Sequence, residues 1–424
     1  MRRLAYYLAI LFVLTVPWEA ALQLGPLGTG GKVVGLVAGT LWLLSAIGRG
    51  YIRPLDSFHK AYFLFLTWSG LTFFWSIAPD STVHELLTYT QLFLMVIMLW
   101  DLLDTREKIE KALQAFVLGA FVTSGTIIAN YLHSPAARFP AHDRVNALGY
   151  KIDGIALIVA IAGPAAWYLA TGPTWSQRSL ALRVLNFAYV PFGGMALILT
   201  GTRGATLASI PTALFILWSL KHASGALRGM ALGAVLCAAV LVYFYAPRGM
   251  LDRISTATTA TQLGQQGGAL AGRWSIWTAS VDVWMHHPVR GVGIGTHRDA
   301  VAPILGQHKI YKTAEKQAHN MYISVLTQTG LVGALLFLGI LVSVFARLRE
   351  LSGWQRWYWS AQVGVLLIDA MSLSLEDNKA VWIFLSLAVA AAAAERAETV
   401  MDTAAAGPPV PPEFVPRRLE PVGR

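Results

Sequence analysis

Long apolar stretches recur along this chain and are separated by short polar connections. A stretch of roughly 18 or more apolar residues is long enough to cross the hydrocarbon core of a bilayer. Because no water is present there to satisfy backbone groups, such a stretch is expected to be helical. The pattern predicts about twelve membrane-spanning helices, near residues 4–23, 33–48, 58–77, 86–103, 111–131, 152–170, 183–200, 204–220, 228–246, 320–346, 356–374 and 379–395.

The composition agrees with this pattern. Apolar residues make up 55% of the 424 positions and charged residues 13%, whereas soluble domains carry about 25% charged residues. The net charge of +10 would indicate nucleic acid binding in a soluble protein. In a membrane protein it is better explained by loops that face anionic lipid or an anionic lipid substrate, so no nucleic acid partner is expected. Cys237 is the single cysteine and lies in an apolar run, which excludes a disulfide framework within one chain.

The positions of lysine and arginine predict the orientation. If the N-terminus is cytoplasmic, 19 of the 33 lysines and arginines lie in cytoplasmic loops and tails, and six lie in the short loops outside. The other eight lie in one long outside segment, which the positive-inside rule does not count. We therefore expect both termini to be cytoplasmic.

That long segment, residues 247–318, divides the chain. A long connection without spans is usually functional or disordered, and the helical spacing of tryptophans from Trp274 to Trp284 predicts an amphipathic helix at the membrane interface. Pro288 should end this helix, and the glycines at 291–295 supply a turn. The expected organisation is nine spans in 1–246, the outside loop in 247–318, three spans in 319–395, and a disordered cytoplasmic tail in 396–424.

Two arginines beside glycines are the first candidates for chemistry. Arg203 stands at the predicted start of a span, and Arg273 stands at the head of the amphipathic helix. A guanidinium binds phosphate oxygens through two parallel hydrogen bonds and keeps its charge, and a helix N-terminus favours an anion. The competing interpretation is that each arginine only anchors its helix at the interface. Two of them on one membrane face indicate a phosphate or diphosphate site.

His319 is the candidate general base. It lies where the long loop returns to the membrane, and we place it in the first turn of a span. There the positive end of the helix dipole disfavours imidazolium and keeps the ring neutral, as a general base requires near neutral pH. The competing interpretation is a structural histidine at the interface. The histidines as a group do not show a metal-ligand spacing, so we expect no metal and no cofactor.

The order of these motifs resembles the O-antigen ligase and polymerase family. The resemblance rests on TRG at 202–204, AGRW-x-IW at 271–277, HPVRGVGIG at 287–295, HN-x-Y at 319–322 and TGLVG at 329–333. It implies that Arg203 and Arg273 bind the donor diphosphate and that His319 is the essential histidine. Asn320 and Tyr322, in the same motif, are further candidates.

An acidic residue near the end of the chain is also described for some members of the family. Asp369, Glu376 and Asp377 compete for this match. Asp369 lies inside a predicted span, where an ionisable residue marks a functional site by default. Glu376 lies at the outer end of the same span, and its competing interpretation is a solvated loop. Arg144 lies in an outside loop that can meet a sugar or phosphate or can simply be exposed.

The resemblance implies an all-α polytopic glycosyltransferase, similar to the GT-C class, in the bacterial inner membrane with its site facing the periplasm. An O-antigen ligase transfers O-antigen polysaccharide from undecaprenyl diphosphate to the lipid A-core oligosaccharide, and we expect this transfer to be metal-independent and inverting. The alternatives within the family are an O-antigen polymerase and a protein O-oligosaccharyltransferase. Outside it, the alternative is a transporter or flippase for lipid-linked glycans, for which charged residues near the midplane and repeated halves are expected.

Overall fold

The computed structural model describes residues 1–133, 147–149, 152–174, 178–222, 225–245, 269–307 and 317–405. These residues form helices, with a single isolated β-bridge between Gln23 and Thr29. The α-helices are α1 (Arg2–Thr15), α2 (Gly30–Arg49), α3 (Ser57–Leu71), α4 (Pro79–Leu102), α5 (Arg106–His133), α6 (Ile152–Thr171), α7 (Leu180–Thr200), α8 (Arg203–Ala208), α9 (Ile210–Lys221), α10 (Gly225–Tyr245), α12 (Ala269–His286), α13 (His297–Gln307), α14 (Met321–Leu348), α15 (Gly353–Asp369) and α16 (Lys379–Ala405). Three short 3₁₀ helices are η1 (Val16–Ala21), η2 (Gly25–Leu27) and η3 (Thr72–Trp75).

Nine helical segments of the described chain are long and apolar enough to cross a membrane. They correspond to α1 with η1, α2, α4, α5, α6, α7, α8 with α9, α14 and α16. The three other predicted spans coincide with α3, α10 and α15, of which α3 and α15 have 15 and 17 residues. The chain is therefore a multi-pass membrane protein, and the count of twelve stays a prediction.

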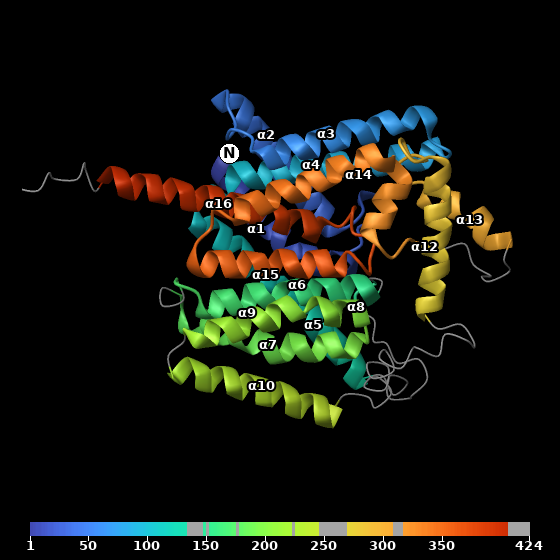
Figure 1. Ribbon diagram of the computed structural model, residues 1–424. Coiled ribbons are helices and arrows are strands. Elements are labelled where there is room, and N and C mark those ends of the chain that lie inside the picture. The colour runs from blue at the N-terminus through green and yellow to red at the C-terminus, as the bar shows by residue number, and fades with distance from the viewer. Residues whose placement is uncertain are drawn as a thin grey trace, which may run out of the picture.

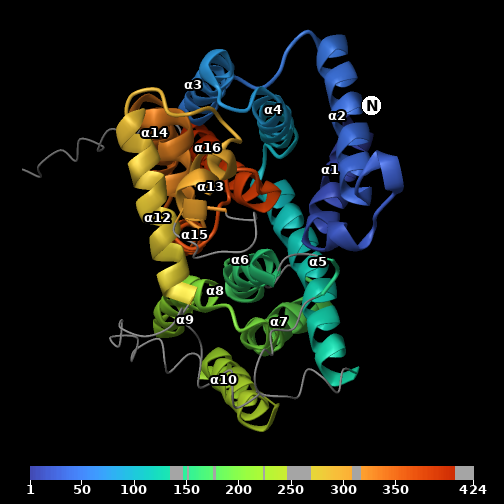
Figure 2. The ribbon, with the colours of Figure 1, turned by 90° about the vertical axis from the view of Figure 1, so that its right-hand side faces the viewer.

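The long helices run side by side, and α12 lies across one end of them (Figure 1). Figure 2 looks onto that end, with α12 passing over the neighbourhood of α14 and α15. α12 contacts α13 and α14, whereas α6 and α16 are buried along most of their length. Small residues are frequent in both buried helices, alanine in α16 and alanine with glycine in α6, which lets neighbouring backbones approach closely where lipid supplies no hydrophobic drive. We call the end that α12 covers the site end and the other the opposite end.

The helix predicted from the spacing of tryptophans is present as α12. It ends at His286, directly before the His287–Pro288 pair, and the glycines that follow have positive φ angles. Trp274 is 65% exposed, whereas Ile276 is buried, so the helix is amphipathic. Helix α13 was not predicted, because its sequence is polar and contains Pro303, yet its apolar side chains pack on those of α12.

Two other expectations from the sequence need correction. The span predicted at 320–346 is not a continuous helix, because α14 is broken at Gly330, where φ is 66° and ψ is −169°. The part of the predicted disordered tail that the structure describes, residues 396–405, belongs to α16. Arg396 there donates to Glu350 over 2.7 Å, an ion pair that ties this end of the helix to the bundle. Residues 406–424 lie outside the described residues.

Candidate functional site

The turn that follows α15 is the meeting point of the site. Asp369 is the last residue of α15 and is fully buried. Ser372 donates through Oγ to the Asp369 carboxylate oxygen Oδ1 over 3.2 Å. The backbone N–H of Met321 donates to the carbonyl of Ala370 over 2.8 Å, and the Tyr322 hydroxyl donates to the carbonyl of Leu367 over 3.0 Å. The HN-x-Y segment is thus fixed against the end of α15.

Helix α8, which begins at Arg203, packs against the same turn through Gly204. Arg203 follows Thr202 at the N-cap position. A Cβ on Gly204 would stand 2.7 Å from the Cβ of Ser372 and 3.6 Å from Oδ1 of Asp369, so only glycine allows this approach. The predicted contribution of a helix N-terminus does not hold here, because α8 has only six residues and Thr202 makes no side-chain cap.

Arg273 approaches from α12. It interacts electrostatically with Asp369, as does Asp153 at the start of α6. One turn further along α12, the indole N–H of Trp277 donates to the carbonyl of Ala318 over 2.8 Å. The helix that carries Arg273 therefore also holds the residue before His319.

Neither arginine is used by the fold. Arg203 and Arg273 are both partly exposed, and neither forms a hydrogen bond or salt bridge within the described residues. Oδ2 of Asp369 is buried and also has no hydrogen-bond partner there. Guanidinium groups in this state are free to bind an oxyanion through bidentate hydrogen bonds.

The sequence predicted that His319 lies in the first turn of a span, but in the structure it precedes α14. Asn320 is the N-cap, and its side-chain oxygen accepts from the N–H groups of Tyr322 and Ile323 over 3.0 and 3.1 Å, so the helix begins at Met321. His319 therefore precedes the cap, and its φ is 47°. A left-handed conformation at a residue with a Cβ costs of order 1–3 kcal/mol and persists only where neighbours impose it. The bonds to Ala318 and Met321 on either side impose it here.

Glu376 lies apart from this turn. It is 6% exposed, so the interpretation of a solvated loop is wrong, and it accepts a hydrogen bond from Ser324 in the second turn of α14. Burial, together with the nearby Asp377, raises the pKa of Glu376 to about 8. Asn320 and Tyr322 act as the helix cap and as an anchor to α15, and Arg144 lies outside the described residues.

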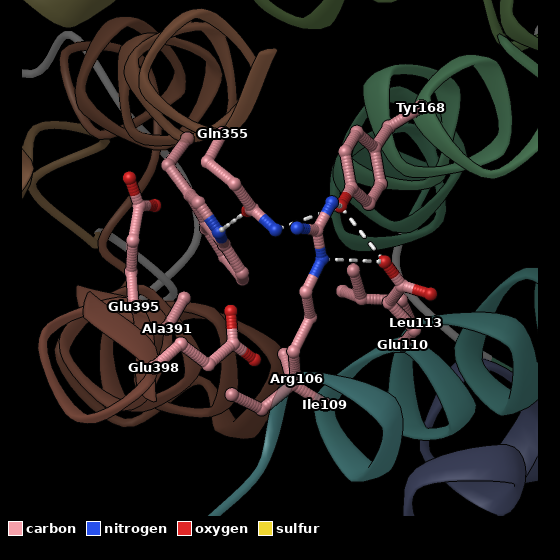
Figure 3. Close-up of a pocket in the computed structure, with 10 residues that line it drawn as sticks. Arg106, Ile109, Glu110, Leu113, Tyr168, Gln355, Ala391, Glu395 and Glu398 are labelled. Atoms are coloured by element: carbon pink, nitrogen blue, oxygen red, sulfur yellow. Dashed lines mark hydrogen bonds and ion pairs between the residues drawn. The ribbon is translucent and has the colours of Figure 1, made fainter. Parts of the chain in front are cut away.

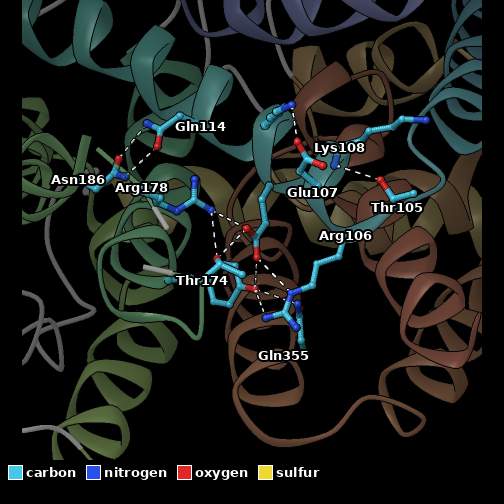
Figure 4. Close-up of polar contacts among 12 residues, drawn as sticks. Thr105, Arg106, Glu107, Lys108, Gln114, Thr174, Arg178, Asn186 and Gln355 are labelled. Atoms are coloured by element: carbon cyan, nitrogen blue, oxygen red, sulfur yellow. Dashed lines mark hydrogen bonds and ion pairs between the residues drawn. The ribbon is translucent and has the colours of Figure 1, made fainter. Parts of the chain in front are cut away.

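A second polar cluster, which was not predicted from the sequence, lies at the opposite end. Arg106 of α5 extends between Glu110 and Gln355 along a pocket whose far side is formed by α16 (Figure 3). Glu110 accepts from Arg106, Tyr168, Thr174 and Arg178, at 3.2, 2.9, 2.8 and 2.6 Å (Figure 4). Arg106 and Arg178 are thus paired with Glu110, in contrast to Arg203 and Arg273.

The described residues hold no group of three or more histidine, cysteine or acidic side chains placed to bind a metal ion.

Residues 188–338 match the family model described as O-Antigen ligase. The matched region contains Arg203, Arg273 and His319, together with all five motifs on which the resemblance rested. No curated protein matches the chain.

Proposed function

Because residues 188–338 match the family model described as O-Antigen ligase, we propose that the chain belongs to this family and is the ligase, which transfers O-antigen polysaccharide from undecaprenyl diphosphate to the lipid A-core oligosaccharide. The observation that carries the proposal is the convergence of Arg203, Arg273 and the His319 segment on the turn after α15. The site end then faces the periplasm of a bacterial inner membrane, and both termini are cytoplasmic.

The donor diphosphate lies between Arg203 and Arg273. Neither guanidinium group forms a hydrogen bond or salt bridge within the described residues, so no such bond has to break when the anion binds. Asp369 interacts with Arg273 and helps to orient it. As the bond between the sugar and the diphosphate breaks, negative charge grows on the leaving oxygen, and preorganised cations stabilise that charge.

His319 takes the proton of the attacking hydroxyl. The acceptor oxygen forms a bond to the anomeric carbon while the bond from that carbon to the diphosphate oxygen breaks. The electron pair of the broken bond leaves on the diphosphate, and the proton goes to the imidazole. A single displacement of this type inverts the anomeric configuration. A positioned acid–base group of this kind typically contributes about 10²–10⁴-fold in rate.

The test is a reaction of the purified protein with a lipid-linked glycan and a lipid A-core acceptor in the presence of EDTA. A glycolipid of higher mass that disappears in Arg273→Ala is the expected product. Products that grow only on the carrier would indicate a polymerase, glycan on added protein would indicate a protein O-oligosaccharyltransferase, and no product in any arm would favour a transporter. Activity that EDTA abolishes and Mg²⁺ restores would contradict the role given to the arginines.

A further inference from the structure

The break in α14 interrupts the backbone hydrogen bonds of a long apolar helix. At Gly330 the chain leaves the helical conformation, so carbonyl groups before the break and N–H groups after it lose their partners within the helix. Inside a membrane no water replaces them, and each unsatisfied group costs several kcal/mol.

Residues 288–293 supply the missing partners. The N–H groups of Val292 and Gly293 donate to the carbonyls of Thr327 and Gln328 over 3.3 and 2.9 Å. In return, the N–H groups of Leu331 and Val332 donate to the carbonyls of Pro288 and Val289 over 2.8 and 3.3 Å. The Trp68 indole donates to the carbonyl of Thr329 over 2.9 Å. We call residues 288–293 with 327–332 the glycine interlock.

Two glycines make this close backbone contact possible. A Cβ on Gly330 would stand 2.3 Å from the carbonyl oxygen of Val289, and a Cβ on Gly291 would stand 2.3 Å from that of Gln328. Both residues also have a φ of 66°, which side chains with a Cβ rarely adopt. Gly339, further along α14, has open space around it and no positive φ, so it provides a matched control.

The interlock joins the two elements that carry the proposed site. Residues 288–293 continue directly from α12, which carries Arg273, and residues 327–329 belong to the segment of α14 that begins after His319. A further bond, from Thr327 Oγ1 to the carbonyl of Ser280, ties the middle of α12 to the same segment over 3.2 Å.

We propose that the glycine interlock sets Arg273 and His319 relative to each other for the transfer step, which makes Gly330 and Gly291 positioning residues. The catalytic part of this inference rests on the proposed function. Reacting groups must be held within a fraction of an ångström, because a misplacement of about 1 Å can cost roughly 10²-fold in rate.

The kinetic test compares Gly330→Ala with Gly339→Ala, alone and with His319→Ala. Gly330→Ala should lower kcat by roughly 10- to 10²-fold and leave the KM for the lipid-linked donor within about threefold. In the His319→Ala background it should change the residual rate less than about twofold, because misplacing an absent base has no effect. Losses that multiply in the double variant, or an equal loss in Gly339→Ala, would overturn the proposal.

A measurement that does not depend on activity completes the test. In a Cys237→Ser background, spin labels at the exposed Thr278 of α12 and the exposed Met371 after α15 report how α12 sits over the site. Gly330→Ala should broaden or shift their distance distribution, and Gly339→Ala should not. An unchanged distribution overturns the proposal, whereas full activity in His319→Ala refutes the proposed function alone.

Thr327→Val serves if Gly330→Ala does not fold. It keeps the shape of a side chain that is 1% exposed and removes the bond to Ser280. The same distance change and the same lack of effect in the His319→Ala background are expected, and their absence overturns the proposal.

Discussion

The two ends of the bundle use arginine in opposite ways. At the opposite end, Arg106 and Arg178 share the carboxylate of Glu110, with bonds of 3.2 and 2.6 Å. At the site end, Arg203 and Arg273 have no hydrogen bond or salt bridge within the described residues, although a buried carboxylate, Asp369, lies nearby. The two clusters have the same residue types and differ in whether the charges are already paired.

From this difference we infer that the Glu110 cluster stabilises the fold, whereas Arg203 and Arg273 are kept for binding a ligand. A buried charge that is paired from several directions holds helices together, and the Glu110 side chain is only 8% exposed. A partly exposed arginine without a partner contributes little to the fold and keeps its binding capacity for a ligand. The comparison therefore predicts that substitutions in the cluster at the opposite end lower stability and that substitutions of the arginines at the site end lower activity.

The largest expected effect is that of Glu110→Ala. It leaves Arg106 and Arg178 unpaired, and breaking a buried pair costs about 3–5 kcal/mol. Thermal unfolding in detergent should show a strongly lowered midpoint, with unchanged turnover per folded molecule. The control is Glu107→Ala on the same helix, where an exposed carboxylate pairs only with Lys111, and the midpoint should hardly move. Equal midpoints for the two variants would contradict the structural role of Glu110.

Arg203→Ala should show the reverse pattern. Removing one group that stabilises the developing charge costs about 10²–10³-fold in kcat, while the free energy of unfolding changes by less than about 0.5 kcal/mol. Arg273→Ala should behave in the same way. Arg298 on α13 is exposed, so Arg298→Ala controls for charge at this end and should keep full turnover. A drop in the melting midpoint of Arg203→Ala as large as that of Glu110→Ala would remove the distinction between the ends.

A smaller effect is expected from Arg203→Lys. Lysine keeps the charge but makes no bidentate contact with a phosphate, and a hydrogen bond to a charged group contributes about 1.5–3 kcal/mol. Steady-state ligation should therefore fall by roughly 10- to 10²-fold, less than in Arg203→Ala. Wild-type turnover in Arg203→Lys would return this arginine to the role of an interfacial anchor.

The last prediction concerns the pH dependence of stability and Glu376. Its pKa in the folded protein is about 8, above the unfolded value of about 4.3, so the folded state holds the proton more tightly. Its contribution to stability is therefore complete below about pH 4 and declines as the pH rises towards 8. Melting midpoints from pH 5 to 9 should fall less steeply in Glu376→Gln than in the wild type. Parallel curves would show that Glu376 does not titrate in this way.

Hydropathy predicted much of this architecture, and the orientation inferred from charge placement stays a prediction. The predicted spans coincide with helices, because bilayer thickness sets helix length directly. The same count of spans predicted Arg203, Arg273 and His319 on one membrane face, and in the structure the segments that carry them lie at the site end.

Tertiary partners explain what the sequence did not reveal. The break at Gly330 interrupts no apolar pattern, and the backbone of residues 288–293 supplies hydrogen-bond partners on both sides of it. Asn320 displaced the start of α14 past His319 through its capping bonds, a choice that hydrophobic periodicity cannot detect. The cluster around Glu110 joins α5, α6 and α15, which are far apart in the chain.

The measurement that tests the central claim most directly is the stabilisation of the protein by undecaprenyl-diphosphate-linked donor. A ligand that binds the folded state stabilises it by mass action, by about 2.7 kcal/mol at a concentration of 100 Kd. This gain in stability raises the melting midpoint. The account predicts a clear upward shift for the wild type and for Arg298→Ala, and none at the same concentration for a protein with both Arg203→Lys and Arg273→Lys. An equal shift in the doubly substituted protein would contradict the account, because the donor would then bind without the two unpaired arginines.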